Sequence, residues 1–291
     1  MLQAGLSRRG VLVGLGTTAS AICRTGPGFA ASEELKFGLT PVFLTNDLEL
    51  LAHLRIYLER AVGAPVRLVT RRTYQEITSL LGSGQLDAAW ICGYPFVAYR
   101  PQLSLVAVPL WRGQPLYRSY LIAERDRDAR SLDDLKGDTH AFSDPDSNSG
   151  WLVTATALAK KNQSPEGYFS QTIFTWGHRN VVRAVASGLV QSGSVDGYVY
   201  EVMRETEPDL IAGTRVVSMS DLLGFPPVAC ASSVAQEPRT KLLQSALTQM
   251  GADQDGRAVL AMLRLDGFTV AEPQLFDTIA AEVAVVRGSA G

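Results

Sequence analysis

Short apolar runs alternate with amphipathic stretches along this chain, and that alternation is the feature that most constrains its fold. The predicted early strands are residues 35–40 (LKFGLT), 65–70 (PVRLVT) and 86–92 (LDAAWIC). Between them, residues 46–62 repeat apolar side chains at helical spacing, and residues 74–81 form a second helical pattern that Gly82 ends. This order is typical of an α/β fold, with a mostly parallel sheet flanked by helices.

A charged stretch, residues 124–130 (ERDRDAR), separates this first unit from a second one of the same type. The elements predicted in the second unit are strand 139–143, helix 150–162, strand 173–175, helix 180–191 and strand 195–199. An extended segment, 225–232, follows, and then helices 238–251, 255–264 and 273–287. We expect two lobes, residues 31–123 plus 225–291 and residues 124–224, joined by crossings near 121–124 and 225–230. Ligands of such folds bind at the carboxyl ends of the strands, in the cleft.

The first thirty residues predict a leader peptide. Arg8 and Arg9 precede a short, weakly apolar run, and small residues around Ala30 suit a cleavage site. This pattern is typical of a twin-arginine signal, so we expect export and a periplasmic location. Cys23 follows bulky Ile22, which argues against a lipoprotein. No later stretch is apolar enough to span a bilayer, so stable membrane insertion of the mature chain is not expected.

Charge and cysteine content exclude several classes of protein. The chain has a net charge of −2, and without its first thirty residues it has 24 basic and 29 acidic residues. Nothing in this balance predicts nucleic-acid binding. The two later cysteines, Cys92 and Cys230, leave a disulfide open as an alternative to free thiols. No dinucleotide, phosphate-loop or metal-ligand pattern is present, so no cofactor or metal is expected.

The segment 144–151 (DPDSNSGW) follows a predicted strand and opens a predicted helix. Unpaired N–H groups at a helix start, together with Ser147, Asn148 and Ser149, would suit a small oxyanion, and Gly150 would allow its close approach. The alternative is that Ser147 or Ser149 only caps the helix.

Three other segments end predicted strands on the same side. His178, in WGHRN, follows a strand, and Asp196 and Tyr198 end the next one. Asp196 is a hydrogen-bond acceptor for a ligand that carries a proton or an N–H. Cys92 ends the strand 86–92, where it is either an inert buried thiol or a ligand for a soft metalloid. Cys92, His178 and Asp196 also have the residue types of a thiol hydrolase, a remote alternative.

The order of these motifs resembles the phosphate/phosphite/phosphonate-type periplasmic solute-binding proteins. The matching segments are DAAWICGYP, RSLDDLKG, DPDSNSG, GHRNVVRAVASG and VDGY, and the resemblance spans most of residues 35–235. It implies a type II periplasmic binding protein, a two-lobed venus flytrap that is not an enzyme. Such a protein captures a phosphonate, phosphite or phosphate in its cleft and delivers it to the permease of an ABC transporter.

The resemblance also implies which residues bind. It assigns the ligand to Ser147, Asn148, Ser149, His178 and Asp196, with Thr40 and Tyr94 lining the first-lobe side of the cleft. This chain has Ser-Asn-Ser where the phosphonate binders usually have Ser-Thr-Ser. Cys92 is similar to the cysteine of periplasmic arsenite-binding sensors in the same superfamily, which partner a sensor histidine kinase. A metalloid ligand with that partner is therefore the alternative function.

Overall fold

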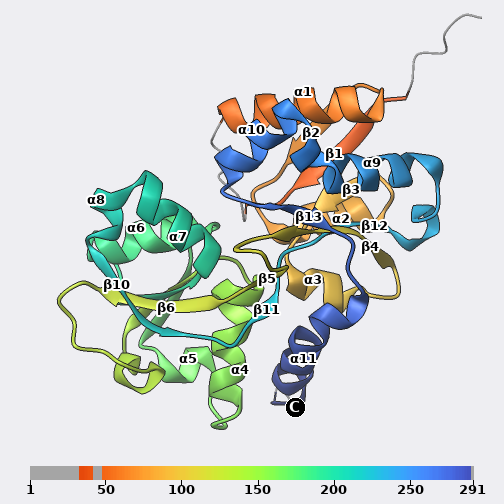
Figure 1. Cartoon of the computed structure of the whole chain (residues 1–291). Coiled ribbons are helices and arrows are strands. Elements are labelled where there is room, and N and C mark those ends of the chain that lie inside the picture. The colour runs from red at the N-terminus through yellow and green to blue at the C-terminus, as the bar shows by residue number, and fades with distance from the viewer. Residues whose placement is uncertain (1–32, 42–47, 290–291) are drawn as a thin grey trace, which may run out of the picture. The chain divides into compact units, whose positions relative to one another are not determined.

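The computed structural model describes residues 33–41 and 48–289, so the expected leader lies outside the described residues. The first sheet has the strand order β13-β4-β12-β3-β1-β2. Its strands are β1 (Leu35–Leu39), β2 (Val66–Thr70), β3 (Ala88–Trp90), β4 (Leu103–Leu110), β12 (Val228–Ala231) and β13 (Gly267–Thr269). The helices α1 (Leu48–Val62), α9 (Pro238–Thr248) and α10 (Gln254–Leu263) lie beside it (Figure 1).

Local sequence explains the early helices. In α1, the buried side chains Leu50, Leu54 and Leu58 recur every four residues, which gives the helix one apolar face. Helix α2 (Tyr74–Gly82) begins with a capping box: the Thr73 hydroxyl accepts from the Glu76 N–H, and the Glu76 carboxylate accepts from the Thr73 N–H. The capping box thus accounts for the start of α2.

The second sheet has the order β10-β6-β9-β7-β8. Its strands are β6 (Ser119–Glu124), β7 (Thr139–Phe142), β8 (Gln171–Phe174), β9 (Ser192–Asp196) and β10 (Thr214–Met219). Its helices are η1 (Leu132–Leu135), η2 (Asn148–Leu152), α4 (Val153–Ala159), α5 (Pro165–Tyr168), α6 (His178–Ala186), α7 (Gly197–Thr206) and α8 (Pro208–Ile211). In Figure 1, α6, α7 and α8 lie on one side of β6 and β10, and α4 and α5 lie on the other.

Both sheets are mixed. Parallel pairs join β1 to β2 and β3, and β7 to β8 and β9, as the strand–helix alternation predicts. Strands β6, β12 and β13 pair antiparallel with their neighbours. Residues 197–199, predicted as the end of a strand, instead open α7, because Asp196 caps that helix. The parallel strands β1, β2, β3, β7 and β8 were thus predicted from the sequence, whereas β9 begins three residues before the predicted strand 195–199, directly after the predicted helix 180–191.

The chain crosses between the sheets twice, and a short ladder joins the two crossings. Strands β5 (Leu116–Tyr117) and β11 (Leu223–Gly224) pair antiparallel there. The boundary expected at 123/124 stays a prediction; β6, in the second sheet, begins at Ser119.

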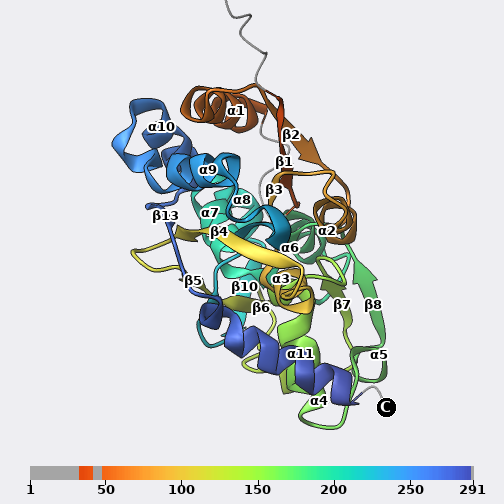
Figure 2. The same cartoon turned by 90° about the vertical axis from the view of Figure 1, so that its right-hand side faces the viewer.

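The last segments of the chain return to the first sheet and end in a long helix. The remaining elements are α3 (Gly93–Ala98), η3 (Ser232–Val234), η4 (Met250–Ala252), η5 (Pro273–Phe276) and α11 (Asp277–Ser289). Helix α11 contacts both α3 and α4, and Figure 2 shows it in dark blue beside α4. Within residues 33–41 and 48–289, no helix has the length and apolar character that crossing a membrane requires.

Candidate ligand-binding site

Residues 143–147 form the turn between β7 and η2. The Ser147 hydroxyl accepts a 3.0 Å hydrogen bond from the Gly150 N–H, so Ser147 caps the helix. Gly150 is required for packing, because a Cβ there would lie 1.9 Å from the Ser143 hydroxyl oxygen. Asn148 and Ser149 are buried. The Ser149 Oγ and Asn148 Oδ1 atoms have no hydrogen-bond partner among the described residues. The capping interpretation of the motif is therefore confirmed for Ser147, whereas ligand binding by Asn148 and Ser149 stays a prediction.

His178 and Asp196 lie together, each at the start of a helix. His178 Nδ1 accepts a 3.1 Å hydrogen bond from the Asp196 N–H. Burial lowers the pKa of His178 to about 3, so the ring is neutral. Because Nδ1 is an acceptor, the proton is on Nε2, which donates to the Tyr74 hydroxyl at 3.1 Å. This bond connects the second sheet to α2, beside the first sheet.

The Asp196 carboxyl is buried and only half used. Its Oδ1 accepts from the Val199 N–H at 3.1 Å, while Oδ2 has no hydrogen-bond partner within the described ranges. Burial raises the pKa of Asp196 to about 7. Burial also raises the pKa of Asp144 to about 6. Two carboxyl groups that resist ionisation therefore lie in or near this region.

Cys92 approaches the same turn from the end of β3. Its Sγ accepts a 3.2 Å hydrogen bond from the Asn148 N–H. Burial raises the pKa of the thiol to about 12, so it is protonated at neutral pH. Both Cys92 and Cys230 are free cysteines. The two nitrogens of His178 are engaged by Asp196 and Tyr74, so the thiol–imidazole pair of a hydrolase is not formed.

Two tyrosines complete the cluster, and the sequence did not single them out as binding residues. Tyr74 binds His178, and its backbone N–H donates to Asp144 Oδ2 at 3.1 Å. The Tyr117 hydroxyl accepts from Asn148 Nδ2 at 3.0 Å. The Tyr117 ring is fully buried. No local signal reveals either role, because both contacts join residues far apart in the chain.

Three other predicted residues have different neighbours. The Thr40 hydroxyl donates to the Trp90 carbonyl at 3.1 Å, at the end of β3. Tyr94 stacks on Trp151, with ring centroids 6.1 Å apart. The Tyr198 hydroxyl donates to the Leu263 carbonyl at 2.5 Å. Their ligand-binding roles stay predictions, and these contacts show that each side chain also has a structural role.

None of the described residues that form this cluster is a lysine or an arginine. No described group of three or more His, Cys, Asp or Glu residues could hold a metal ion. The cluster presents hydrogen-bonding groups to a ligand: hydroxyl donors on Ser149 and the tyrosines, and acceptors on Asp196 and Asn148.

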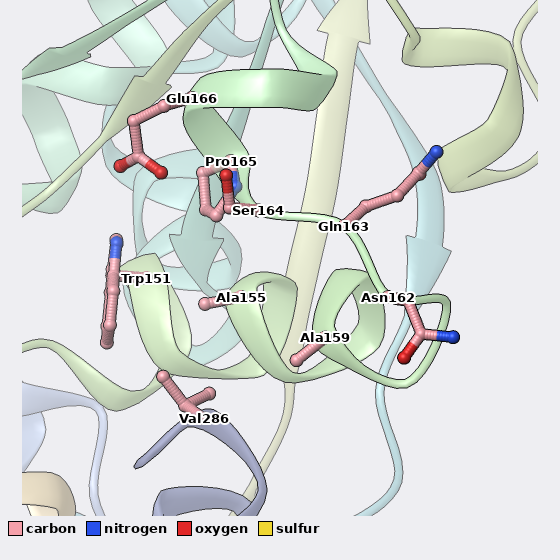
Figure 3. Close-up of a pocket in the computed structure, with 9 residues that line it drawn as sticks. All are labelled: Trp151, Ala155, Ala159, Asn162, Gln163, Ser164, Pro165, Glu166 and Val286. Atoms are coloured by element: carbon pink, nitrogen blue, oxygen red, sulfur yellow. The ribbon is translucent and has the colours of Figure 1, made fainter. Parts of the chain in front are cut away.

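A separate pocket of about 590 Å³ lies beside α4 (Figure 3). Ala155 and Ala159 on α4 line it, with Trp151, Glu166 and Val286 of α11 towards one end and Asn162 and Gln163 at the other. None of the nine candidate binding residues lines it. It is therefore distinct from the cluster of His178 and Asp196.

Comparisons with known proteins agree with this fold. Residues 37–276 match the family model described as "ABC transporter, phosphonate, periplasmic substrate-binding protein". The phosphonates-binding periplasmic protein of Escherichia coli (strain K12) is 26% identical over 221 residues, which cover 71% of this chain and 62% of that relative. The chain thus spans less than two thirds of that relative's length.

Two solved structures share the architecture. One is a binding protein component of an ABC phosphonate transporter from Pseudomonas aeruginosa, with a TM-score of 0.80 and 23% identity, covering 88% of this chain and 87% of that one. The other is a protein from Prochlorococcus marinus (MIT 9301) in complex with methylphosphonate, with a TM-score of 0.78 and 17% identity, covering 87% and 98%. These likenesses show the type II periplasmic binding protein fold. The family match over most of the length shows that this chain belongs to the periplasmic substrate-binding proteins of phosphonate ABC transporters.

Proposed function

We propose that this protein binds a small phosphorus oxyanion, of the phosphonate, phosphite or phosphate class, for an ABC transporter. One observation carries the proposal: buried polar atoms without partners gather where side chains from both sheets meet. Ser149 Oγ, Asn148 Oδ1 and Asp196 Oδ2 are such atoms among the described residues. Leaving buried polar groups unpaired costs about 1–3 kcal/mol each, so a ligand that pairs them would recover that energy.

The chemistry of the cluster favours a ligand that still carries a proton. Hydroxyl and N–H donors would receive the anionic oxygens, as they do at helix starts elsewhere. Asp196 cannot donate when it is ionised, so an ionised Asp196 would need a P–OH, an N–H or an ammonium group from the ligand. A monoanionic phosphonate meets both requirements without a lysine or an arginine.

The family and the named relative support the transport role. The ladder of β5 and β11, with β6 and β12 after it, would be the hinge about which the two sheets close on the ligand. A permease would then recognise the closed form.

The twin-arginine pair supports export. Replacing Arg8 and Arg9 by lysines should leave precursor in the cytoplasmic fraction, and unchanged export would exclude the twin-arginine route.

A ligand screen tests the proposed binding. Methylphosphonate, 2-aminoethylphosphonate, phosphite, phosphate, sulfonates and arsenite would be compared by thermal shift and calorimetry. We expect a phosphorus oxyanion to bind and Ser149→Ala to weaken it. Ser104→Ala is the matched control. Ser104 lies in β4 of the first sheet, and its exposed hydroxyl donates to the Ser232 hydroxyl. No binding of any of these ligands would refute the proposal.

Arsenite sensing is a second candidate, and the position of Cys92 is the observation that favours it. The Cys92 thiol touches the Asn148 N–H in the middle of the cluster, where a metalloid could bond to sulfur. The partner would then be a sensor histidine kinase. Arsenite binding that Cys92→Ser abolishes, with no binding of phosphonates, would favour sensing. Arsenite binding that survives Cys92→Ser would remove this candidate.

A further inference from the structure

Two hollows adjoin on the surface of the second sheet. None of the residues that line them belongs to the cluster of His178 and Asp196. One, of about 480 Å³, lies along β10, α7 and α8. The other, of about 460 Å³, lies between α7, the start of β6 and the connection that precedes β5. Arg204 and Met219 line both hollows, so the two hollows are neighbours. We call the pair of hollows the arginine groove.

The arginine groove is positively charged on a protein whose net charge is −2. Its arginines are Arg112, Arg118, Arg125, Arg204 and Arg215. Glu201 is the single acidic residue among the lining residues, so five arginines and one glutamate leave an excess of four positive charges. The Glu201 carboxylate is 3.2 Å from both Arg112 and Arg204, and one carboxylate cannot neutralise two guanidinium groups.

Several of these guanidinium groups are held in place. Arg112 lies over the Trp111 ring, 4.4 Å from its centroid, and Arg204 lies over Tyr200 at 5.6 Å. Arg118 donates to the Ser220 carbonyl. Stacking on an aromatic ring leaves the edge of a guanidinium free for a carboxylate. The groove therefore presents fixed cations, which lose less side-chain entropy when they bind.

The groove also has apolar points of contact and an extended shape. The Met219 side chain is 54% exposed and Leu222 is 43% exposed. Strand β10 is an edge strand, since it pairs with β6 on one side and with no other strand in the described part of the sheet. An edge strand lined by cations and apolar side chains suits an extended chain more than a small anion.

We propose that the arginine groove binds an acidic segment of a partner protein, in extended form, with apolar residues among its carboxylates. Charge complementarity carries this proposal: the carboxylates would pair with Arg112, Arg125 and Arg204, and the apolar side chains would cover Met219 and Leu222. The proposal does not depend on the ligand that the cluster of His178 and Asp196 takes.

Binding of a labelled peptide tests this surface. The probe is a fluorescein-labelled decapeptide with glutamates and two leucines, measured by fluorescence anisotropy against the purified protein. The same peptide with glutamine in place of glutamate is the control probe. We expect the acidic peptide to bind at least about tenfold more tightly than the glutamine peptide at low salt, and to weaken as salt is added.

Variants assign the binding to the groove. Arg125→Gln with Arg204→Gln should weaken the acidic peptide by about three- to thirtyfold, since exposed charge pairs contribute modestly. Arg55→Gln with Arg67→Gln removes the same charge from exposed arginines beside the first sheet, and should leave binding unchanged. Equal weakening by both double variants, or by neither, would overturn the proposal. Groove-dependent binding to phosphatidylglycerol vesicles without peptide binding would overturn it in favour of a membrane surface.

Discussion

The buried carboxyl of Asp196 should make the protein less stable as the pH rises. Burial holds its pKa at about 7, against an ordinary value of 3.8, so the folded protein keeps a proton that the unfolded chain releases. A group of this kind favours folding at low pH, and that contribution is lost as the pH rises from about 4 towards 7. Between pH 5 and pH 8, this one carboxyl should lower the free energy of unfolding by about 2–3 kcal/mol.

Asp196→Asn isolates this effect. Asparagine keeps an oxygen to accept the Val199 N–H, so the cap of α7 is retained, and the ionisation is removed. Urea unfolding without ligand, at pH 5 and at pH 8, gives the free energies for the variant and the original protein. The free energy of unfolding of the variant minus that of the original protein should be about 2–3 kcal/mol higher at pH 8 than at pH 5.

The comparison of two pH values cancels any structural cost that the substitution has at both. Asp126→Asn, at an exposed turn, is the matched control and should show no such difference. A difference between variant and original protein that is equal at pH 5 and pH 8 would refute the reasoning. It would mean that water reaches the Asp196 carboxylate in the unliganded protein.

Three further predictions concern the same cluster. Ser147→Ala should lower the free energy of unfolding by about 1 kcal/mol because a cap is lost. Ser149→Ala should change the free energy of unfolding little and weaken methylphosphonate binding by about tenfold or more. Urea unfolding and calorimetry check the two variants, and the reverse pattern would contradict the prediction. Tyr74→Phe should cost about 1–3 kcal/mol because the N–H of His178 loses its acceptor, and an unchanged urea midpoint would show that this bond is absent. Cys92, with its pKa raised to about 12, should resist iodoacetamide at neutral pH and react only in urea, by mass spectrometry; rapid labelling of the folded protein would show a reactive thiol.

The strands and helices could be predicted where a periodic apolar pattern or a cap determines them. The start of α2 is consistent with its capping box and its end with Gly82, and the turn before η2 follows from DPDSNSG. Strand β10 was not predicted, and its pairing with β6 is irregular between Val216 and Ser218. The start of α7 was misread because β-branched and aromatic residues in VDGYV resemble a strand, while the capping role of Asp196 depends on its backbone geometry.

The candidate site shows the same division. Ser149, His178 and Asp196 were predicted because each follows a strand, and parallel strands bring their ends together. The hydrogen bonds of Tyr74 and Tyr117 to this cluster were not, because they join residues 104 and 31 positions apart. Such contacts depend on how α2 and the first crossing pack against the second sheet, and no local pattern encodes that packing.

None of the described residues that form the cluster of His178 and Asp196 is a lysine or an arginine, and this has a consequence for the medium in which the protein works. Attraction through hydrogen bonds between buried groups is shielded little by dissolved ions, in contrast to attraction between exposed charges. Capture of an oxyanion by this cluster should therefore persist in brackish or salt-rich surroundings. The arginine groove on the same molecule would release its acidic partner under those conditions, so one protein would carry a salt-tolerant and a salt-sensitive contact.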